Sequence, residues 1–521
     1  MWLHSENIHL APKKKDVVVC VDFTVRESTT ISSSKDDVND VAQVVAYRNH
    51  GHLNARNFYT DVYRRGKVRV GRIGERSAQD AQIYYHISPE NPVVYVRPGD
   101  VLRLTCHYDT MDKNAVIPFS ASELHGEMCN QYLMGSNIAL SPNMPGRACD
   151  VASTSKVHFD PPGVVVDWKS SDGSTDVKMG EVASLALVEE GVGKNVLWAF
   201  HRGNGNFWNK NLITTSTIVS KGIGGSGGGG GGGSSQQLGR NQFIVPHGLS
   251  MDRWGFFWAT DTVLHQVFRI QASTGEIAVT LGVARVSGND GTHFNQPTDV
   301  ALSPDGSLVY ISDGYGNSRV VVYKASAASG NAGAAGAAGQ DAFVYSHEWG
   351  SFGRGPGQFD TPHSVAVDAR GRVYVADRHN ARVQVFRPSG GGGGAPLAVW
   401  QAPIDRVTPW ASLSPVQQSA AARKGPDGST WLYHVTALCY EPYLDVLFVV
   451  EGGDVVMRSV GGDELQRIDG GVSGDGDSEE VVGALRWPHD VEATVSLDGK
   501  YVVVYVAELK GKRIRKYQIA L

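Results

Sequence analysis

The sequence lacks three features that would assign it to familiar classes of protein. No segment approaches the roughly 18 consecutive apolar residues of a membrane-spanning helix. No two cysteines have the Cys-x-x-Cys spacing of thiolate zinc sites and thioredoxin-like proteins. The formal net charge of −5 argues against a protein that binds nucleic acid by neutralising its phosphates. We therefore expect neither a membrane span nor a nucleic-acid partner.

The cysteines and the N-terminus give conflicting indications of the cellular compartment. Four of the five cysteines lie in the first 150 residues, and Cys439 stands apart. An even cluster without metal-binding spacing indicates disulfides and an oxidising compartment, and four cysteines allow three pairings. Residues 1–16, however, have neither the basic start nor the apolar core of a signal peptide. Either the protein is cytosolic, or the sequence begins downstream of its true start.

The pattern of the sequence changes near residue 180. The chain of 521 residues is long enough for about two or three domains. Short Val/Tyr/Ile-rich runs separated by turn residues predict an antiparallel β-sandwich in the first part. These runs lie at 15–25, 41–48, 58–73, 82–87, 93–105 and 130–139. Glycine-rich stretches at 222–234, 325–339 and 390–394 lack the pattern of a phosphate-binding loop and predict surface loops.

An internal repeat occupies the second part of the chain. Each copy has Pro-His or Pro-Thr, an apolar strand, an Asp/Gly turn, a second strand that ends near an acid, and a basic strand. Clear copies begin at Pro246, Pro297, Pro362 and Pro488, and weaker ones lie at 182–208 and 434–460. Each unit is too small to bury its own apolar face, so the six units predict a closed six-bladed β-propeller.

These units resemble NHL repeats and, more closely, the lyase half of the bifunctional peptidylglycine α-amidating monooxygenases. The resemblance is carried by HRGNGNFW (201–208), VPHGLSMD (245–252), SDGYGNSR (312–319), VADRHNARVQVF (375–386) and WPHDV (487–491). It covers about residues 180–521 and all six units. It implies a peptidylamidoglycolate lyase, which cleaves peptides ending in α-hydroxyglycine to the peptide amide and glyoxylate.

Three histidines directly follow the proline of their repeat: His247, His363 and His489. Equivalent positions in successive blades lie at one height around the propeller axis, so the three imidazoles can converge. Three histidine ligands with an open fourth position are typical of catalytic zinc. The alternative is that these histidines only pack between blades.

The resemblance also implies the other residues of the lyase site. Arg202, Tyr315 and Arg378 align with the active-site residues of the family. An arginine offers a planar fork for the substrate carboxylate, and the tyrosine could act as the base.

A structural calcium is implied as well, held by the carboxylate of Asp490 and the backbone carbonyls of Leu249 and Leu185. The alternative for Asp490 is that it caps its own turn. Trp487 stands where animal relatives have Met, and its indole could narrow the substrate pocket. We expect Cys439 to be an unpaired, buried side chain.

Residues 43–52 (QVVAYRNHGH) and 125–134 (HGEMCNQYLM) resemble the second copper-binding domain of the hydroxylase half. His50 and His52 alternate on a predicted strand, and Met128 adds a thioether, a set that suits copper cycling through Cu(I). The alternative is a sandwich that no longer binds copper. The resemblance also implies peptide-binding residues and two disulfides: Arg48, Asn130 and Tyr132 for the peptide, and Cys106–Cys129 and Cys20–Cys149 for the disulfides.

The predicted architecture is all-β. A β-sandwich like the C-terminal domain of copper type II monooxygenases spans 1–155, a linker 156–180, and a six-bladed NHL-type propeller 181–521. We expect zinc, calcium and, at the second hydroxylase site only, copper. The expected partners are glycine-extended or α-hydroxyglycine peptides, and the expected location is the secretory pathway or the extracellular space.

Two alternatives remain. The first copper domain of the hydroxylase is missing from the sequence, so we do not expect this chain to hydroxylate peptides alone. The first alternative is a complete bifunctional enzyme whose first copper domain is absent here. The second alternative is a non-catalytic NHL propeller that binds other proteins.

Overall fold

The structure is a computed structural model of the whole chain. The residues that it describes are all except 1, 6–8, 16, 26–41, 53, 65–67, 78–79, 81–83, 87–93, 98, 119–126, 137–146, 149–163, 167–178, 190–194, 204, 206–210, 224–235, 327–342, 389–394, 402–434, 469–484, 497–500 and 521. They form two compact units, Met1–His158 with Arg458–Leu465, and Phe159–Met457 with Gln466–Leu521. We refer to these as unit 1 and unit 2.

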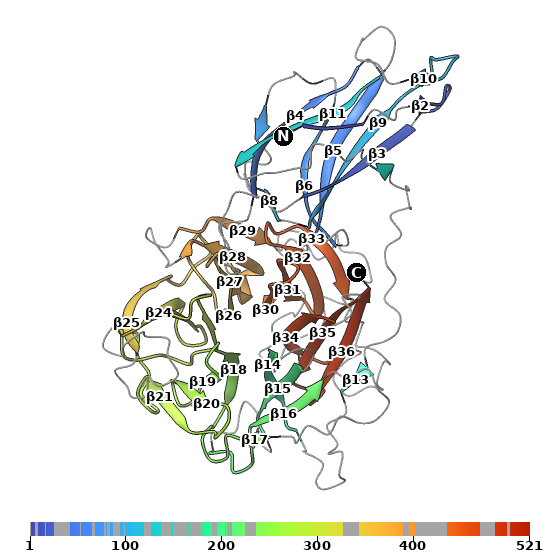
Figure 1. Cartoon of the computed structure of the whole chain (residues 1–521). Helices are drawn as coiled ribbons and strands as arrows, with labels where there is room; N and C mark the ends of the chain where they lie inside the picture. The colour runs from blue at the N-terminus through green and yellow to red at the C-terminus, as the bar shows by residue number, and fades with distance from the viewer. Residues whose placement is uncertain are drawn as a thin grey trace, which may run out of the picture. The chain divides into compact units, whose positions relative to one another are not determined.

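Strands account for nearly all of the regular structure in the described residues (Figure 1). The helix that these residues contain, η4 (Arg378–Asn380), is a single 3-10 turn. The predicted all-β fold class is therefore confirmed. Among the described residues, no helix has the length and apolarity needed to cross a membrane.

Unit 1 consists of two five-stranded sheets and a two-stranded ribbon in its described part. The first sheet contains β1 (Trp2–Ser5), β11 (Cys129–Ser136), β4 (Ala42–His50), β7 (Tyr85–His86) and β8 (Val94–Val96). The second contains β12 (Arg147–Ala148), β3 (Val17–Thr24), β9 (Val101–Tyr108), β5 (Ala55–Arg64) and β6 (Val68–Ser77). The ribbon pairs β2 (His9–Leu10) with β10 (Ile117–Pro118).

Apolar side chains from both sheets form the interior of this sandwich. Val44 and Leu133 on the first sheet and Phe58 and Leu104 on the second are each at most 2% exposed. Contacts of β11 with β5 and β9 join the two sheets. The run at 58–73, predicted as one strand, is instead two strands, β5 and β6, which pair as a hairpin.

Unit 2 contains six four-stranded antiparallel sheets among its described residues. Five of them follow the chain: β14 (Val182–Glu189), β15 (Asn195–His201), β16 (Ile218–Ile223) and β17 (Gln237–Leu238); β18 (Pro246–Met251), β19 (Phe256–Asp261), β20 (Gln266–Gln271) and β21 (Ile277–Leu281); β22 (Asp299–Leu302), β23 (Leu308–Asp313), β24 (Arg319–Ala325) and β25 (Phe343–Trp349); β26 (Pro362–Val367), β27 (Val373–Asp377), β28 (Arg382–Phe386) and β29 (Ala398–Gln401); β30 (Val435–Glu441), β31 (Val446–Glu451), β32 (Asp454–Ser459) and β33 (Glu464–Ile468). The sixth joins β34 (Pro488–Val495), β35 (Tyr501–Glu508) and β36 (Arg513–Ala520) to β13 (Val164–Val165).

The first strands of these sheets contact one another in a closed cycle. β14 contacts β18, and the contacts continue through β22, β26, β30 and β34 back to β14. Apolar side chains fill the space between neighbouring sheets, and Leu185 and Tyr505 belong to the cluster that joins the last sheet to the first. Unit 2 is therefore a β-propeller, and its six sheets agree with the predicted number of blades.

The sixth sheet is completed by a strand from the beginning of unit 2. Val164 pairs with Lys516 on β36, and the N–H of Val166 donates to the carbonyl of Ile514 at 2.9 Å. This strand, β13, lies within the segment predicted to be a linker. Its two residues are too few for the sequence to show a periodic pattern. The exact domain boundaries stay a prediction.

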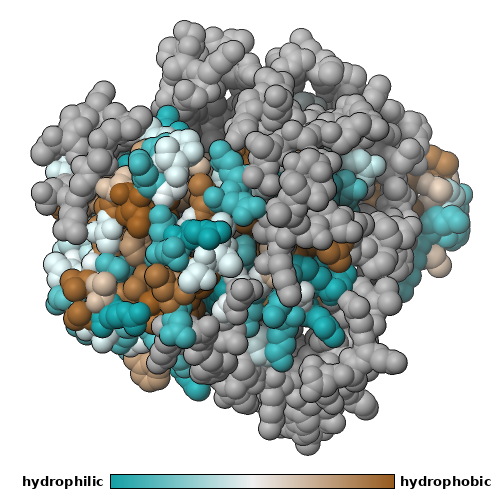
Figure 2. Space-filling model, turned by 90° about the horizontal axis from the view of Figure 1, so that it is seen from below, coloured by the Kyte–Doolittle hydropathy of each residue, from teal (hydrophilic) through white to brown (hydrophobic). Residues whose placement is uncertain are grey.

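Apolar and polar residues are interspersed over the part of the surface that Figure 2 displays in colour. Exposed large apolar side chains such as Phe352 and Met111 are far apart in the sequence and belong to different units. Such scattered apolar residues are normal on folded proteins.

Candidate functional site

The first strand of each sheet lines the centre of unit 2. The strand pairing shifts at the start of several of these strands, for example between Pro246 and Leu249 and between Pro362 and Ser364. Such bulges re-aim side chains, and here two successive residues face the centre. A small cavity is accordingly lined by a pair of residues from every sheet: 183–184, 247–248, 298–299, 363–364, 436–437 and 489–490.

The structure brings the three predicted histidines together in this ring. His247, His363 and His489 come from alternate sheets, and their ring centroids lie 4.8, 4.6 and 4.9 Å apart. One ligand atom of each lies within 4.8 Å of the others. All three side chains are buried. The group can hold a metal ion.

Backbone contacts orient each imidazole for that task. The Nδ1 atom of each histidine lies 2.7 Å from a carbonyl oxygen of the next sheet: Thr298 for His247, Thr436 for His363 and Ala183 for His489. A carbonyl can only accept a hydrogen bond, so Nδ1 carries the proton and the neutral ring keeps a lone pair on Nε2. Metal-binding histidines commonly have this arrangement.

The surroundings of the ring keep the imidazoles neutral. Burial lowers the pKa of all three histidines, and it lowers the pKa of His489 to about 3. The positive charges of Arg202 and Arg378 lower the pKa of His489 further. The same positive charges lower the pKa of His247.

Tyr315 adds a hydroxyl group beside two of the histidines. Its oxygen lies 3.0 Å from Nε2 of His247 and 3.0 Å from Nε2 of His363. Gly314 permits this position, because a Cβ atom there would overlap the carbonyl oxygen of Pro362. Close approach to Pro362 therefore explains why the motif SDGYGNSR has a glycine at position 314.

The two arginines are fixed by their neighbours. Arg202 is 1% exposed, and its guanidinium bonds to the carboxylate of Glu181 at 2.7 Å and to the carbonyl of Pro246 at 3.2 Å. Arg378 begins η4, and its N–H donates to the carbonyl of Thr361 at 3.0 Å. Glu181 was not predicted as a site residue. Its only signal is an acid directly before the first strand of the propeller.

Two partly buried carboxylates belong to the same ring of residues. Asp490 accepts hydrogen bonds from Ser184 Oγ at 2.6 Å and from the N–H of Leu185 at 2.8 Å. Burial raises the pKa of Asp490 to about 7, and the negative charge of Asp299 raises it as well. Burial also raises the pKa of Asp299 to about 6. Asp299 was not predicted.

Leu185 and Leu249, the other predicted calcium residues, lie beside Asp490 in the contact network. The N–H of Leu249 donates to Ser184 Oγ at 3.0 Å, and Ser184 Oγ donates to Asp490. Gly248 allows the strands to approach closely here, because a Cβ atom would lie 2.5 Å from Asp299 Oδ1. Leu185, Leu249 and Asp490 are therefore close together around Ser184.

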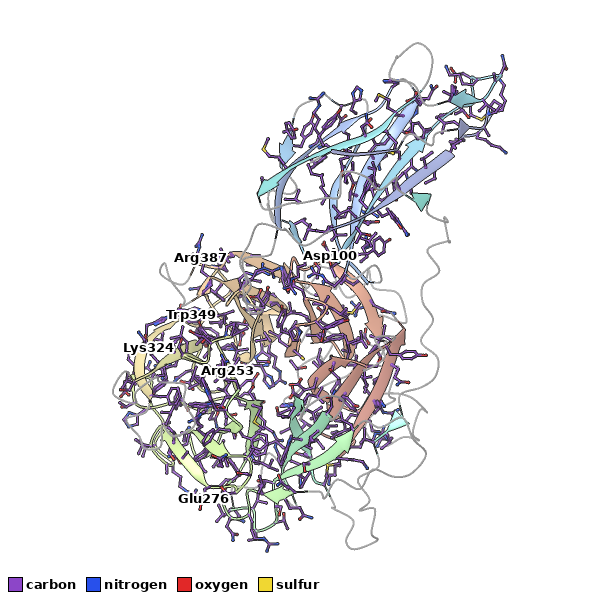
Figure 3. The ribbon with its side chains drawn as sticks, in the orientation of Figure 1. Asp100, Arg253, Glu276, Lys324, Trp349 and Arg387 are labelled. Atoms are coloured by element: carbon purple, nitrogen blue, oxygen red, sulfur yellow. A yellow bond between two sulfur atoms is a disulfide. The ribbon has the colours of Figure 1, made fainter. Side chains whose placement is uncertain are left out.

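A second cavity, of about 340 Å³, is lined by other residues of the same six first strands. Arg253, which is labelled in Figure 3, lines it together with Cys439 and Glu492. Cys439 is a free, buried cysteine, as predicted, and its thiol donates to Glu492 Oε2 at 3.4 Å. Burial raises the pKa of the Cys439 thiol well above its usual value, so this thiol is not a reactive one.

In unit 1 the predicted peptide-binding and copper residues share one face of a sheet. On the paired strands β4 and β11, His50 lies opposite Asn130 and Arg48 opposite Tyr132. Residues two apart on a strand point to the same face. The guanidinium carbon of Arg48 lies 5.3 Å from the centroid of the Tyr132 ring. The structure therefore brings these four residues together.

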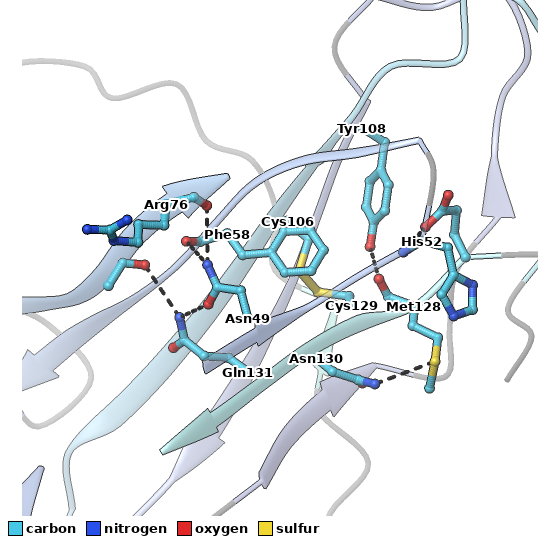
Figure 4. The surroundings of a disulfide bond; sticks show 12 residues. Asn49, His52, Phe58, Arg76, Cys106, Tyr108, Met128, Cys129, Asn130 and Gln131 are labelled. Atoms are coloured by element: carbon cyan, nitrogen blue, oxygen red, sulfur yellow. Dashed lines mark hydrogen bonds between the residues drawn. A yellow bond between two sulfur atoms is a disulfide. The ribbon is translucent and has the colours of Figure 1, made fainter. Parts of the chain in front are cut away.

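His52 and Met128 lie next to this face. The rings of His50 and His52 are 5.6 Å apart between centroids. The Asn130 amide donates to Met128 Sδ at 3.6 Å (Figure 4). Glu127, which was not predicted, accepts from the N–H groups of His52 at 2.9 Å and of Asn54 at 2.7 Å. This buried carboxylate fixes the backbone beside both His52 and Met128.

A disulfide lies at the start of β11, directly after Met128. The predicted bond between Cys106 and Cys129 is present (Figure 4). Tyr108 donates to the carbonyl of Met128 at 2.9 Å. Cys20 is also disulfide-bonded, but its predicted partner, Cys149, lies outside the described residues, so that pairing stays a prediction.

Comparison with known proteins finds similarity in both units. Residues 5–159 match the family described as "Copper type II ascorbate-dependent monooxygenase, C-terminal domain". Over 455 residues the chain is 28% identical to peptidyl-glycine alpha-amidating monooxygenase A of Xenopus laevis, a match that covers 74% of this chain and 46% of the relative. The chain is related to the peptidylglycine α-amidating monooxygenases. It thus spans about half the length of this relative.

The relationship to the α-amidating enzymes extends to separate lyases. Over 216 residues the chain is 33% identical to a probable peptidyl-alpha-hydroxyglycine alpha-amidating lyase of Caenorhabditis elegans, covering 40% of this chain and 56% of that protein. Residues 294–323 and 359–386 match the NHL repeat. These two segments contain Tyr315, His363 and Arg378, which are three residues of the candidate site.

Proposed function

We propose that unit 2 is a peptidylamidoglycolate lyase, which cleaves peptides ending in α-hydroxyglycine into the peptide amide and glyoxylate. The observation that carries this proposal is the ring of three neutral imidazoles with the Tyr315 hydroxyl 3.0 Å from two of them. The names of the relatives support the same reaction.

The histidine ring suits zinc. Zinc binds three histidine nitrogens and keeps an open position in catalytic sites, and each of these histidines offers an unprotonated Nε2. Bound there, zinc would act as a Lewis acid on the substrate hydroxyl. His247, His363 and His489 would be its protein ligands.

The protein groups around the ring match the other needs of the reaction. Arg202 and Arg378 supply positive charge for the substrate carboxylate. Tyr315 is positioned to take the hydroxyl proton. Loss of that proton turns the hydroxyl carbon into the aldehyde of glyoxylate and breaks its bond to nitrogen. The nitrogen takes up a proton and leaves as the peptide amide.

A calcium ion would stabilise the centre of the propeller through the carboxylate of Asp490 and the carbonyls of Leu249 and Leu185. Calcium prefers carboxylate and carbonyl oxygens. Burial raises the pKa of Asp490 to about 7, which disfavours the ionised carboxylate unless a positive charge lies beside it. A divalent cation would favour the ionised form.

Unit 1 would bind copper through His50, His52 and Met128, and glycine-extended peptides through Arg48, Asn130 and Tyr132. The match of residues 5–159 to the copper monooxygenase family and the shared sheet face of four of these residues support this proposal. The Cys106–Cys129 disulfide supports a location in the secretory pathway or outside the cell.

The proposal is tested by mass spectrometry of a synthetic peptide ending in α-hydroxyglycine after incubation with the full chain. We expect the peptide amide and an equimolar amount of glyoxylate, formed faster than in buffer alone. Formation at the buffer rate by a folded, zinc-loaded protein would refute the lyase and favour a propeller that only binds other proteins.

A further inference from the structure

The sheets of unit 2 place equivalent residues at the end of the propeller where the histidines lie. In the sheet that begins with β26, Thr361 precedes Pro362, which pairs with Asp377. The carbonyl of Thr361 accepts the N–H of Arg378. Thr361, which precedes the proline, and Arg378, which follows the acid Asp377, are therefore neighbours at this end of the sheet. Arg378 is one of the two arginines of the candidate site.

The sheet that begins with β34 repeats this arrangement with different residues. Trp487 precedes Pro488, which pairs with Glu508. The carbonyl of Trp487 accepts the N–H of Leu509 at 3.1 Å. Trp487 therefore corresponds to Thr361, and Leu509 to Arg378.

The backbone and side-chain contacts agree with this correspondence. Trp487 and Thr361 both have positive φ, 57° and 64°. Thr361 Oγ1 lies 3.0 Å from Nδ1 of His379, the residue after Arg378. Likewise, Nζ of Lys510, the residue after Leu509, lies 4.2 Å from the centroid of the Trp487 ring. Lys510 thus holds one face of the indole by a cation–π contact.

Trp487 is also close to the histidine ring along the chain. It lies two residues before His489, so their Cα atoms are at most about 7 Å apart. Consecutive residues of a peptide substrate have Cα atoms about 3.8 Å apart. A substrate with its α-hydroxyglycine at the ring would have the preceding residue at a comparable distance.

We propose that Trp487, held by Lys510, contacts the side chain that immediately precedes the α-hydroxyglycine and determines specificity there. The indole offers a large apolar surface, which favours aromatic side chains over small ones at this position of the substrate. This inference rests on the proposed lyase function and adds the class of peptide that the site prefers.

The test compares two synthetic substrates, with Phe or with Gly before the α-hydroxyglycine, in the full zinc-loaded chain. Trp487→Ala should lower the ratio of kcat/KM for the Phe substrate to that for the Gly substrate about tenfold. Lys510→Met should lower the same ratio less, because the indole remains but loses its partner. Lys512→Ala is the control, since this exposed lysine lies on the same turn, and it should keep the wild-type ratio.

The outcomes separate this inference from the function on which it rests. A Trp487→Ala protein with the wild-type ratio overturns the inference but not the lyase. If that variant does not fold, an unchanged ratio in Trp487→Leu and Lys510→Met overturns it instead. Wild-type protein that releases no glyoxylate from either substrate overturns the lyase and this inference together.

Discussion

At Tyr315, one oxygen atom is shared between His247 and His363 at 3.0 Å from each. Tyr315→Phe removes this oxygen and keeps the ring. If Tyr315 takes the substrate proton, kcat should fall about 10²–10⁴-fold. KM should change little, because the arginines provide the carboxylate contact. Steady-state kinetics of glyoxylate release would measure both values.

The matched control for this substitution is Tyr323→Phe. Tyr323 lies on β24 of the same propeller sheet, and its hydroxyl donates to the carbonyl of Gly291 at 2.8 Å. This hydroxyl is not part of the candidate site, so kcat should stay at the wild-type value. A Tyr315→Phe protein with wild-type kcat would show that another group accepts the proton.

His201 has a structural role that pH can expose. The other five sheets end their second strand with Asp or Glu in the described residues, whereas β15 ends with His201. Its Nδ1 accepts hydrogen bonds from the N–H groups of Gly203 at 3.0 Å and Gly180 at 3.3 Å. Burial lowers the pKa of His201 to about 4. The folded state therefore requires the neutral ring.

The sign of the pH dependence follows from this shift. Between the unfolded pKa of about 6.5 and the folded pKa of about 4, only the unfolded state binds the proton. Stability should fall as the pH drops through this range, by on the order of 2–3 kcal/mol. His201→Asn keeps an acceptor but cannot titrate, so its Tm should fall less between pH 7 and pH 4.5. Equal losses of Tm in both proteins would contradict this assignment.

At the scale of elements, the strand β13 closes the propeller. The N–H of Val166 donates to Ile514 on the last strand at 2.9 Å. Val166→Pro removes this donor, and proline within a paired strand is unfavourable. We expect a lower Tm for unit 2 by calorimetry. Val165→Ala is the control, because the Val165 side chain is 45% exposed, and a wild-type Tm for Val166→Pro would show that β13 does not stabilise the fold.

The elements also show what sequence patterns can predict. The repeat around Pro246, Pro297, Pro362 and Pro488 predicted the propeller, because each copy carries a full pattern of strands and turns. The strand β13 could not be predicted, because a strand of two residues is too short to show alternation of apolar and polar side chains. The alternation over 58–73 predicts one strand, whereas this run covers parts of both β5 and β6.

The same limits apply to the candidate site. Equivalent positions in repeats predicted that His247, His363 and His489 would meet, and the structure brings them together. Glu181 was missed because its partner, Arg202, is 21 residues away in the sequence. Asp299 was missed because its partner, Ser364, comes from another sheet. No local motif encodes such contacts. Glu127 was missed for a similar reason, since it acts on the backbone of a distant segment.

At the scale of the whole molecule, the two units carry donor groups that suit different metals. Unit 1 offers imidazole and thioether groups, which suit copper, whereas unit 2 offers three imidazoles, which suit zinc. The related α-amidating monooxygenase of Xenopus laevis aligns with both units. The central claim is that the histidine ring of unit 2 makes the protein a lyase.

The most direct test of this claim is glyoxylate release from a peptide ending in α-hydroxyglycine, measured with the full chain before chelation, after chelation and after adding zinc back. The account predicts that chelation abolishes release and that zinc restores it. Release that persists in the chelated protein, or a folded zinc-loaded protein that releases none, would contradict it.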